Sequence, residues 1–324
     1  MTRLRDKKDD FRALIDATSK ATGIRPAYIE KDYWVTELLR SVAAPVPGKD
    51  GRPEPVVAIF KGGTSLSKAY GLIQRFSEDV DILLDGPELS GAARDRVLRD
   101  LGRRAGADLG LPVTEREKDR GVKRNFEYEY PRIHTADVIS PRLRLEMGFR
   151  GGPQPNAPKD VRSYIAGQAA TQFHLGSETF EEFASVRVAV LAPERTLVER
   201  LMCLHAAARH AQEGEVTELC GCVRHYYDVR QLLRSAEVMA GVPAYGGGVE
   251  GLVADINEES KAAGFASVDR PTEGFAASPA FQIDPTWMKE VRDAYAATLP
   301  QLVWGDCPKF EECLEAVRAR RSEL

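Results

Sequence analysis

The sequence predicts an α/β protein in which an α/β lobe, residues 1–191, precedes a mainly helical lobe, residues 192–324. The first observation is the apolar run VVAIF at 56–60, followed by a short amphipathic stretch and a second apolar run, DVDILL at 79–84. This order is typical of strand, helix and strand. The second observation is VRVAVL at 186–191, which we interpret as the last strand. The third is that the pattern after this strand becomes helical.

The helical lobe is predicted from apolar residues that recur every three or four positions. Leu197, Leu201, Leu204 and Ala208 form one such stripe after Pro193. The same criterion, with Pro and Gly as breakers, assigns the rest of the chain. We expect helices over 7–22, 26–43, 90–108, 286–298 and 309–322, a strand within NFEYEYPRI at 125–133, and loops over 44–55, 151–160 and 241–285.

Charge and hydropathy narrow the class of protein. The chain has 324 residues and a formal net charge of −4, so it has no global electrostatic attraction to nucleic acid. No apolar run approaches the roughly 20 residues that span a bilayer. The N-terminal segment MTRLRDKKDD lacks the apolar core of a signal peptide. We therefore expect a cytoplasmic protein without membrane contact.

The five cysteines are an odd number without the spacing of a disulfide framework, which predicts reduced thiols. Cys220 and Cys222, with His205, His210 and His225 nearby in the sequence, raise the question of zinc. However, a single residue separates the two cysteines, whereas common structural zinc sites have two to four. We therefore assign no zinc site from the sequence.

Gly62, Gly63, Thr64 and Ser65 are predicted to form the turn that enters the helix after the first strand. The two glycines permit backbone conformations and a close ligand approach that a Cβ would block. Backbone N–H groups at a helix start favour an anion, and Thr64 or Ser65 adds a hydroxyl donor. A Gly-Gly-Thr alone is usually only a turn. Its place shortly before an acidic pair favours a phosphate cradle.

That acidic pair is Asp79 and Asp81, which strand alternation places on one face, with Val80 and Ile82 on the other. Two like charges roughly 4 Å apart repel by about 4 kcal/mol at an effective dielectric of 20, so a site that keeps both ionised usually supplies a cation. Oxygen ligands without Cys or His favour Mg²⁺. The alternative for an isolated Asp-x-Asp is a solvated strand edge.

A third acid stands in RLRLEMGFR at 142–150, where polar and apolar residues alternate as in a strand with two unlike faces. Glu146 projects from the same face as Arg144. On its own, such a glutamate is usually an exposed partner of an arginine. Together with the two preceding blocks it becomes a candidate catalytic acid.

These blocks resemble the AbiEii/AbiGii-type nucleotidyltransferases, toxins of bacterial toxin–antitoxin and abortive-infection systems within the DNA polymerase β-like superfamily. In that superfamily a helix-opening glycine with Ser or Thr precedes an Asp-x-Asp, and a third acid follows on a later strand. Gly63, Thr64, Asp79 and Asp81 match the first two parts. The resemblance also covers IEKDYWVTELL at 29–39, RLRLEMGFR at 142–150, LAPERTLVERLMCLH at 191–205, RHYYDVRQLL at 224–233 and GDCPKFEECLEAV at 305–317.

The resemblance implies a nucleotidyltransferase lobe with a small mixed β-sheet flanked by helices. It implies transfer of a nucleoside monophosphate from an NTP to an acceptor hydroxyl, with Mg²⁺ or Mn²⁺ held by Asp79, Asp81 and Glu146. In the better-understood relatives the acceptor is tRNA. A toxin of this kind has a cognate antitoxin, and we expect a winged-helix regulator encoded next to it.

The resemblance also assigns residues of the helical lobe. Where the family usually has Lys, in the block aligned with RTLVERL, this chain has Arg200, and the family's Asp after an Arg corresponds to Asp228 after Arg224. We expect Arg200 to neutralise the triphosphate. Asp228 either acts at the site or is a buried partner of Arg224. Other candidate contacts of the triphosphate are Lys68, Lys61 and Arg195.

Basic residues also cluster next to the aromatic side chains of the NFEYEYPRI strand. Cations beside exposed rings suit RNA, whose phosphates bind Arg and Lys and whose bases stack on aromatics. If the rings face the core instead, the cations only solvate a loop, which is the interpretation we favour. The cations are Arg116, Lys118, Arg120, Lys123, Arg124 and Arg132, and the rings are Phe126, Tyr128 and Tyr130.

Two other functions fit the same motifs. A kinase-like or nucleotide-sequestering toxin would use the same metal site, and comparison of α- with γ-phosphate label distinguishes it from a nucleotidyltransferase. An enzyme of the same fold could instead modify a small molecule or a protein hydroxyl, and ribonuclease treatment of the labelled product distinguishes that case.

Overall fold

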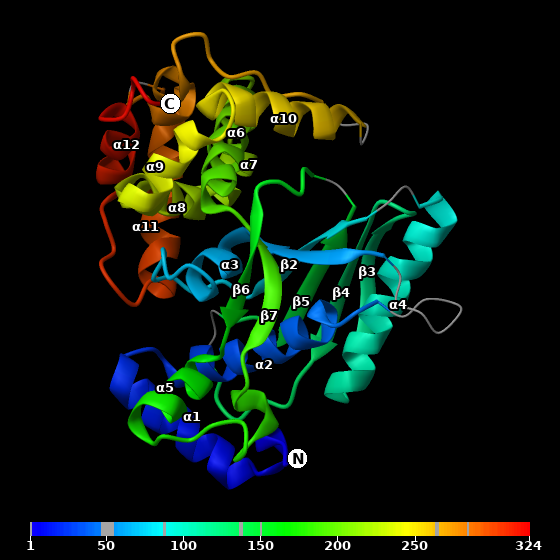
Figure 1. Cartoon of the computed structure of the whole chain (residues 1–324). Coiled ribbons are helices and arrows are strands. Elements are labelled where there is room, and N and C mark those ends of the chain that lie inside the picture. The colour runs from blue at the N-terminus through cyan, green and yellow to red at the C-terminus, as the bar shows by residue number, and fades with distance from the viewer. Residues whose placement is uncertain are drawn as a thin grey trace. The chain divides into compact units, whose positions relative to one another are not determined.

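The structure, a computed structural model, divides into two compact units (Figure 1). The first contains Met1–Ala69 and Phe76–Val190, and the second contains Tyr70–Arg75 and Leu191–Leu324. We propose that these units are the two domains expected from the sequence, with the segment 70–75 added to the second. The structure describes residues 2–46, 55–86, 89–135, 139–149, 151–262, 266–283 and 285–324.

The first unit is built on a mixed sheet of seven strands, counted over the described residues, in the order β3-β4-β5-β2-β1-β7-β6. The central strand β2 pairs in parallel with β5 and antiparallel with β1, and β1 pairs in parallel with β7. The α/β fold class predicted from the sequence is therefore confirmed. The strands are β1 (Val57–Lys61), β2 (Asp79–Asp85), β3 (Val113–Asp119), β4 (Lys123–Glu129), β5 (Arg142–Gly148), β6 (Asn156–Val161) and β7 (Val186–Leu191).

Helices α2 and α4 cover one face of this sheet and leave the other face polar. Figure 1 shows both helices running alongside the strands, and α2 contacts β2 and β5 while α4 contacts β4 and β5. The side chains that alternate toward these helices, such as Val80, Leu145 and Tyr128, are buried. The helices of this unit are α1 (Lys8–Thr22), α2 (Pro26–Ala43), α3 (Gly62–Lys68), α4 (Gly91–Leu109) and α5 (Tyr164–Gln172), with short 3-10 turns at Leu4–Asp6 and Glu181–Phe183.

The aromatic residues of β4 belong to the core. Phe126, Tyr128 and Tyr130 are all buried, and the Tyr128 hydroxyl donates to the carbonyl of Gly102 in α4 at 2.9 Å. A Cβ on Gly102 would lie 2.3 Å from the Phe126 ring, so this glycine lets the helix approach the strand. The interpretation of these rings as a stacking surface for RNA is therefore wrong, and the favoured alternative is right that the rings face the core. Its second part, that the cations only solvate a loop, is wrong, because Arg116, Lys123 and Arg124 lie on strands and form ion pairs.

The second unit consists of helices around the segment 70–75. The main chain of Gln74 donates to the Tyr227 hydroxyl and accepts from Trp304 N, both at 3.1 Å, which anchors the segment. No helix among the described residues is long and apolar enough to cross a membrane. The helices are α6 (Pro193–Gln212), α7 (Val216–Gly221), α8 (Val223–Arg234), α9 (Ala236–Ala244), α10 (Gly248–Ala262), α11 (Met288–Leu302) and α12 (Phe310–Arg318), with 3-10 turns at Phe275–Ala277 and Pro279–Phe281.

The structure corrects three local predictions. The expected loop at 151–160 contains most of β6, because a solvated edge strand needs no apolar alternation. The expected loop at 241–285 contains α10, since residues 245–247, with positive φ at Gly247, form only a short link between α9 and α10. The strand β3 was not predicted, because all seven of its residues are exposed. Most of the loop expected at 44–55 lies outside the described residues.

Candidate active site

Three carboxylates gather on the polar face of the sheet. Asp79 and Asp81 project from β2 on the same side, while Val80 between them is fully buried. In the parallel register of β2 with β5, Asp81 stands beside Glu146 and Asp79 beside Arg144. Strand alternation and register together bring residues 65 positions apart in the sequence into one acidic cluster.

The proximity of the carboxylates shifts the pKa of Glu146. Burial raises the pKa of the Glu146 carboxyl above its ordinary value, and the charges of Asp81 and then Asp79 raise it further. Arg144 opposes the shift, and its Nη1 lies 3.6 Å from Asp79 Oδ1. Glu146 is therefore a carboxylate that accepts a proton more readily than an ordinary glutamate does.

Gly62 makes room for the Asp81 carboxylate. Its φ is +77°, a left-handed conformation that favours glycine, and a Cβ built on it would lie 2.0 Å from Asp81 Oδ2. The first glycine of the Gly-Gly-Thr motif therefore serves the acid directly, whereas the sequence predicted only its role in a phosphate turn.

The two hydroxyls of the motif bind the main chain. Thr64 Oγ1 donates to the carbonyl of Asp79 at 2.5 Å, and Ser65 Oγ donates to the carbonyl of Gly62 at 2.9 Å. Both side chains are buried. Each hydroxyl has a single hydrogen to donate, so these bonds fix the turn against β2 and leave backbone N–H groups as the donors for a phosphate.

A cavity of about 320 Å³ opens beside the cluster, with Asp81 and Glu146 on its wall. Its lining adds Glu117 and Asn125, which were not assigned from the sequence, although Asn125 alternates with buried residues along β4 on the same face as Lys123, a pattern that could have found it. Lys61, in register with Asp81 across β1 and β2, also borders the cavity. The lining is Lys61, Asp81, Ile82, Glu117, Lys123, Asn125, Glu146, Met147 and Gly148.

Lys68 lies in a buried ion pair with Asp32 of α2. Its ammonium also donates to the carbonyl of Arg162 at 3.1 Å, and the second oxygen of Asp32 accepts from the N–H of Tyr164 at 2.8 Å. This network joins α3, α2 and α5. In the described structure the charge of Lys68 is therefore already balanced by a carboxylate.

Asp228 and Arg200 come together in the helical unit. Asp228 is fully buried and accepts two hydrogen bonds of 2.7 Å from the guanidinium of Arg75. The sequence indicated Arg224 as the possible partner and did not point to Arg75. Arg200 Nε lies 3.8 Å from Asp228 Oδ2, and its Nη1 meets His225 Nε2 at 2.6 Å. Arg195, the other arginine considered, is fully buried and pairs with Asp255.

The basic residues near β4 are largely neutralised by neighbours. Arg116 pairs with Glu127 at 2.7 Å, and Lys123 pairs with Glu117 at 2.5 Å. The buried Arg124 is held by Asp95 through two contacts of 2.9 Å and by Glu115 at 2.5 Å. Arg124 is therefore a structural cation, and it cannot serve as a surface contact for a phosphate.

The sequence at residues 53–316 matches a family described as nucleotidyl transferase AbiEii toxin, type IV toxin–antitoxin system. The chain belongs to the AbiEii family. It is therefore a nucleotidyltransferase toxin of a type IV toxin–antitoxin system, as the sequence blocks predicted, and such a system implies a cognate antitoxin.

Other comparisons add little to this assignment. A comparison with curated proteins found no match. Among solved structures, the chain is similar to MenT4, the nucleotidyltransferase toxin Rv2826c from Mycobacterium tuberculosis H37Rv, at 16% identity and a TM-score of 0.37, over 96% of each chain.

Membership of the AbiEii family implies an NTP substrate and a divalent metal. The donor set fits a hard cation, because Asp79, Asp81 and Glu146 offer only oxygen ligands. The close approach of Asp81 to Gly62, which a Cβ would prevent, keeps this carboxylate beside the turn. No choice of one oxygen from each of the three carboxylates brings all three oxygens within 4.8 Å of one another. Binding of one ion by all three therefore requires side-chain movement.

Proposed function

We propose that this AbiEii toxin transfers a nucleoside monophosphate from an NTP to a hydroxyl of tRNA, with Mg²⁺ as the cofactor and Mn²⁺ as a substitute. One observation supports this most: Asp81 of β2 and Glu146 of β5 stand side by side at the wall of an open cavity, and Asp79 projects from the same face of β2. Adjacent like charges oppose folding, so a chain that keeps them together gains from them in function.

Asp79, Asp81 and Glu146 are the residues that would hold the metal. When bound, Mg²⁺ neutralises charge on the triphosphate and orients it for in-line displacement. Glu146 would either help to hold a metal or take the proton from the attacking acceptor hydroxyl. That hydroxyl oxygen forms the new bond to the α-phosphorus as the bond to pyrophosphate breaks.

We assign the turn of Gly62, Gly63, Thr64 and Ser65 to the leaving phosphates, through its backbone N–H groups. Family membership supports this assignment, and the hydroxyl bonds to the main chain rigidify the turn. Lys68 then acts by holding α3 in place through Asp32.

Arg200 is proposed to neutralise the triphosphate, in the place where the family usually has Lys. Its guanidinium is partly exposed, unlike that of Arg195, and its contacts with His225 and Asp228 orient it. Asp228 is a positioning residue in this proposal, since Arg75 already occupies both of its oxygens.

The acceptor and the antitoxin are proposed from the family. Both tRNA and NTPs are cytoplasmic, so we place the reaction there. We further propose that a winged-helix regulator encoded beside the toxin is the antitoxin.

The test incubates the enzyme with Mg²⁺, total tRNA and NTPs labelled at either the α- or the γ-phosphate, and resolves the products on a gel. We expect α-label on RNA that ribonuclease removes. Asp81→Asn should lower the transfer by about 100-fold or more while the circular dichroism spectrum is unchanged. The matched control is Asp85→Asn, which removes the same charge from the other end of β2 and should leave transfer intact.

Other results would reassign the function. Label from the γ-phosphate alone indicates a kinase-like toxin. Label on a small molecule or on protein, with tRNA unmodified, retains the nucleotidyltransferase but removes tRNA as the acceptor. Full transfer by folded Asp81→Asn would refute the proposed site.

A further inference from the structure

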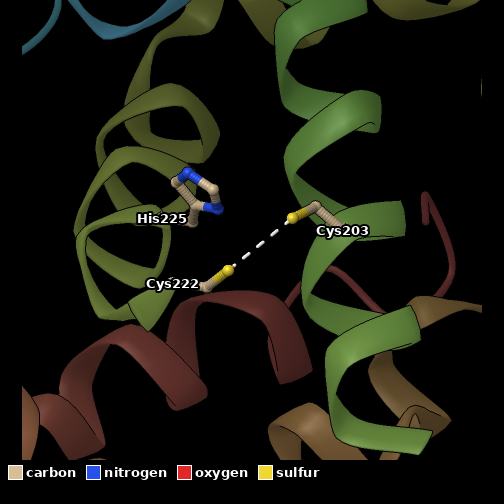
Figure 2. Close-up of side chains that lie close together, drawn as sticks. All are labelled: Cys203, Cys222 and His225. Atoms are coloured by element: carbon tan, nitrogen blue, oxygen red, sulfur yellow. Dashed lines mark hydrogen bonds between the residues drawn. The ribbon is translucent and has the colours of Figure 1, made fainter. Parts of the chain in front are cut away.

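Two thiols and an imidazole converge in the helical unit. Cys203 comes from α6, Cys222 from the junction of α7 and α8, and His225 from the first turn of α8 (Figure 2). One ligand atom from each lies within 4.8 Å of the other two. Among the described residues this is the one group of three Cys, His, Asp or Glu side chains with that geometry.

The separation of the thiols matches a metal site. Cys203 Sγ and Cys222 Sγ are 3.8 Å apart. Two sulfur ligands of a tetrahedral zinc ion, each about 2.3 Å from the metal, also lie about 3.8 Å apart. The two side chains therefore already have the spacing that such an ion requires.

His225 offers an unused nitrogen. Its Nε2 accepts from Arg200 Nη1 at 2.6 Å, because a guanidinium can only donate. Its Nδ1 is buried and has no hydrogen-bond partner among the described residues. A buried ring nitrogen without a partner is costly, and Figure 2 shows the ring next to the two thiols.

We propose that Cys203, Cys222 and His225 bind a thiophilic divalent metal ion of the zinc type, with the fourth position left to water. Thiolate and imidazole ligands select zinc over the oxygen-preferring Mg²⁺. This differs from the pattern weighed in the sequence, because Cys220 is outside the group and the second thiol comes from 19 residues before Cys222. The spacing of cysteines along the sequence could not reveal this group, because Cys203 lies in α6 and Cys222 lies at the start of α8.

Metal binding has a structural consequence for Arg200. If Nδ1 of His225 binds the metal, the ring proton must reside on Nε2, which can then no longer accept from Arg200. The guanidinium is released toward Asp228, whose Oδ2 lies 3.8 Å from its Nε. The ion also ties α6 to the junction of α7 and α8.

The experiment titrates Co²⁺ into the reduced, metal-free, full-length protein. We expect one equivalent to produce the near-ultraviolet sulfur-to-cobalt absorption and visible bands of tetrahedral cobalt, and Zn²⁺ to displace it. Cys203→Ser and Cys222→Ser should each lower the sulfur-to-cobalt absorption and weaken cobalt binding, because each removes one of the two thiolates, and the double variant should lose the band. His225→Gln should weaken cobalt binding while retaining the band. Zinc should raise the melting temperature of the wild type but not that of Cys222→Ser.

Two controls separate this site from other metal sites. Cys220→Ser removes a thiol two residues from Cys222 and should keep the full absorption. Asp81→Asn should also keep it, because carboxylate ligands give no sulfur-to-cobalt band. Circular dichroism of each variant confirms folding.

Three outcomes would overturn the proposal. The first is a reduced wild type without the sulfur-to-cobalt band. The second is a band of undiminished intensity in folded Cys222→Ser, or one that disappears in folded Cys220→Ser. The third is a protein whose two thiols form a disulfide, seen as the loss of two hydrogens in mass, and which binds no cobalt after reduction.

Discussion

Replacing Glu146 by Gln should stabilise the metal-free protein and inactivate it. The substitution keeps the side-chain size and removes the charge that stands beside Asp81 in the register of β2 with β5. Because neighbouring strands lie about 4.8 Å apart, the two carboxylates repel by about 3 kcal/mol at an effective dielectric of 20 and about 1 kcal/mol at 80. We therefore expect the unfolding free energy to rise by about 1–3 kcal/mol near neutral pH.

The pH dependence follows from the raised pKa of Glu146. A carboxyl whose pKa is higher in the folded chain binds more protons there than in the unfolded chain, so its contribution to stability falls as the pH rises through and above its ordinary value of about 4.3. The advantage of Glu146→Gln should accordingly be largest near neutral pH and shrink in acid, where the wild-type carboxyl is protonated.

The assay is hydrogen exchange of the β2 and β5 amides in EDTA, which reports on the unit that contains Glu146. Adding Mg²⁺ should protect the wild type more than the variant, because the cation removes the repulsion. Glu117→Gln is the control: this residue lines the same cavity but pairs with Lys123 at 2.5 Å, so its loss should give no gain. A Glu146→Gln variant that exchanges faster than the wild type in EDTA would refute this account of the cluster.

Three further predictions concern the turn and the helical unit. Gly62→Ala should lower transfer activity severely, since its Cβ meets the Asp81 carboxylate, whereas Gly23→Ala, with a similar φ but open space, should change stability only; equal activity losses would contradict this. Arg75→Ala should destabilise the protein by about 3–5 kcal/mol in chemical denaturation, because it removes both hydrogen bonds to the buried Asp228 and leaves only the more distant Arg200, and a loss under 1 kcal/mol would contradict it. Arg200→Ala should raise the KM for NTP or lower kcat, with partial recovery in Arg200→Lys, and unchanged kinetics would remove this residue from the site.

The sequence predicted the parts of the structure that local periodicity specifies. Alternation within β2 was enough to predict that Asp79 and Asp81 lie on one face of that strand, and alternation within β5 predicted that Glu146 lies on the polar face of its strand. It was not enough to find the pairing of Arg75 with Asp228, because these residues are 153 positions apart and only the folded helical unit brings them together. Long-range ion pairs leave no periodic signal in a single sequence.

The same limit applies to the surroundings of the cations. Arg124 was grouped with surface residues because its neighbours in the sequence are charged, yet its side chain points to the helix side of β4, where it meets Asp95. Lys68 was assigned to a ligand from its nearness to the glycine turn, and its carboxylate partner Asp32 is 36 residues earlier. Nearness along the chain did not specify the direction in which either side chain points.

The composition of β3 affects how separate copies of the protein meet. This strand ends the strand order, so one side of its main chain has no strand partner among the described residues. All seven residues are exposed, and Arg116, Glu117 and their neighbours form ion pairs across to β4. A strand from a second copy could extend the sheet here only by desolvating these charges and matching the register shift between Glu115 and Glu117. This edge therefore acts against aggregation, a property that neither the core nor the carboxylate cluster provides.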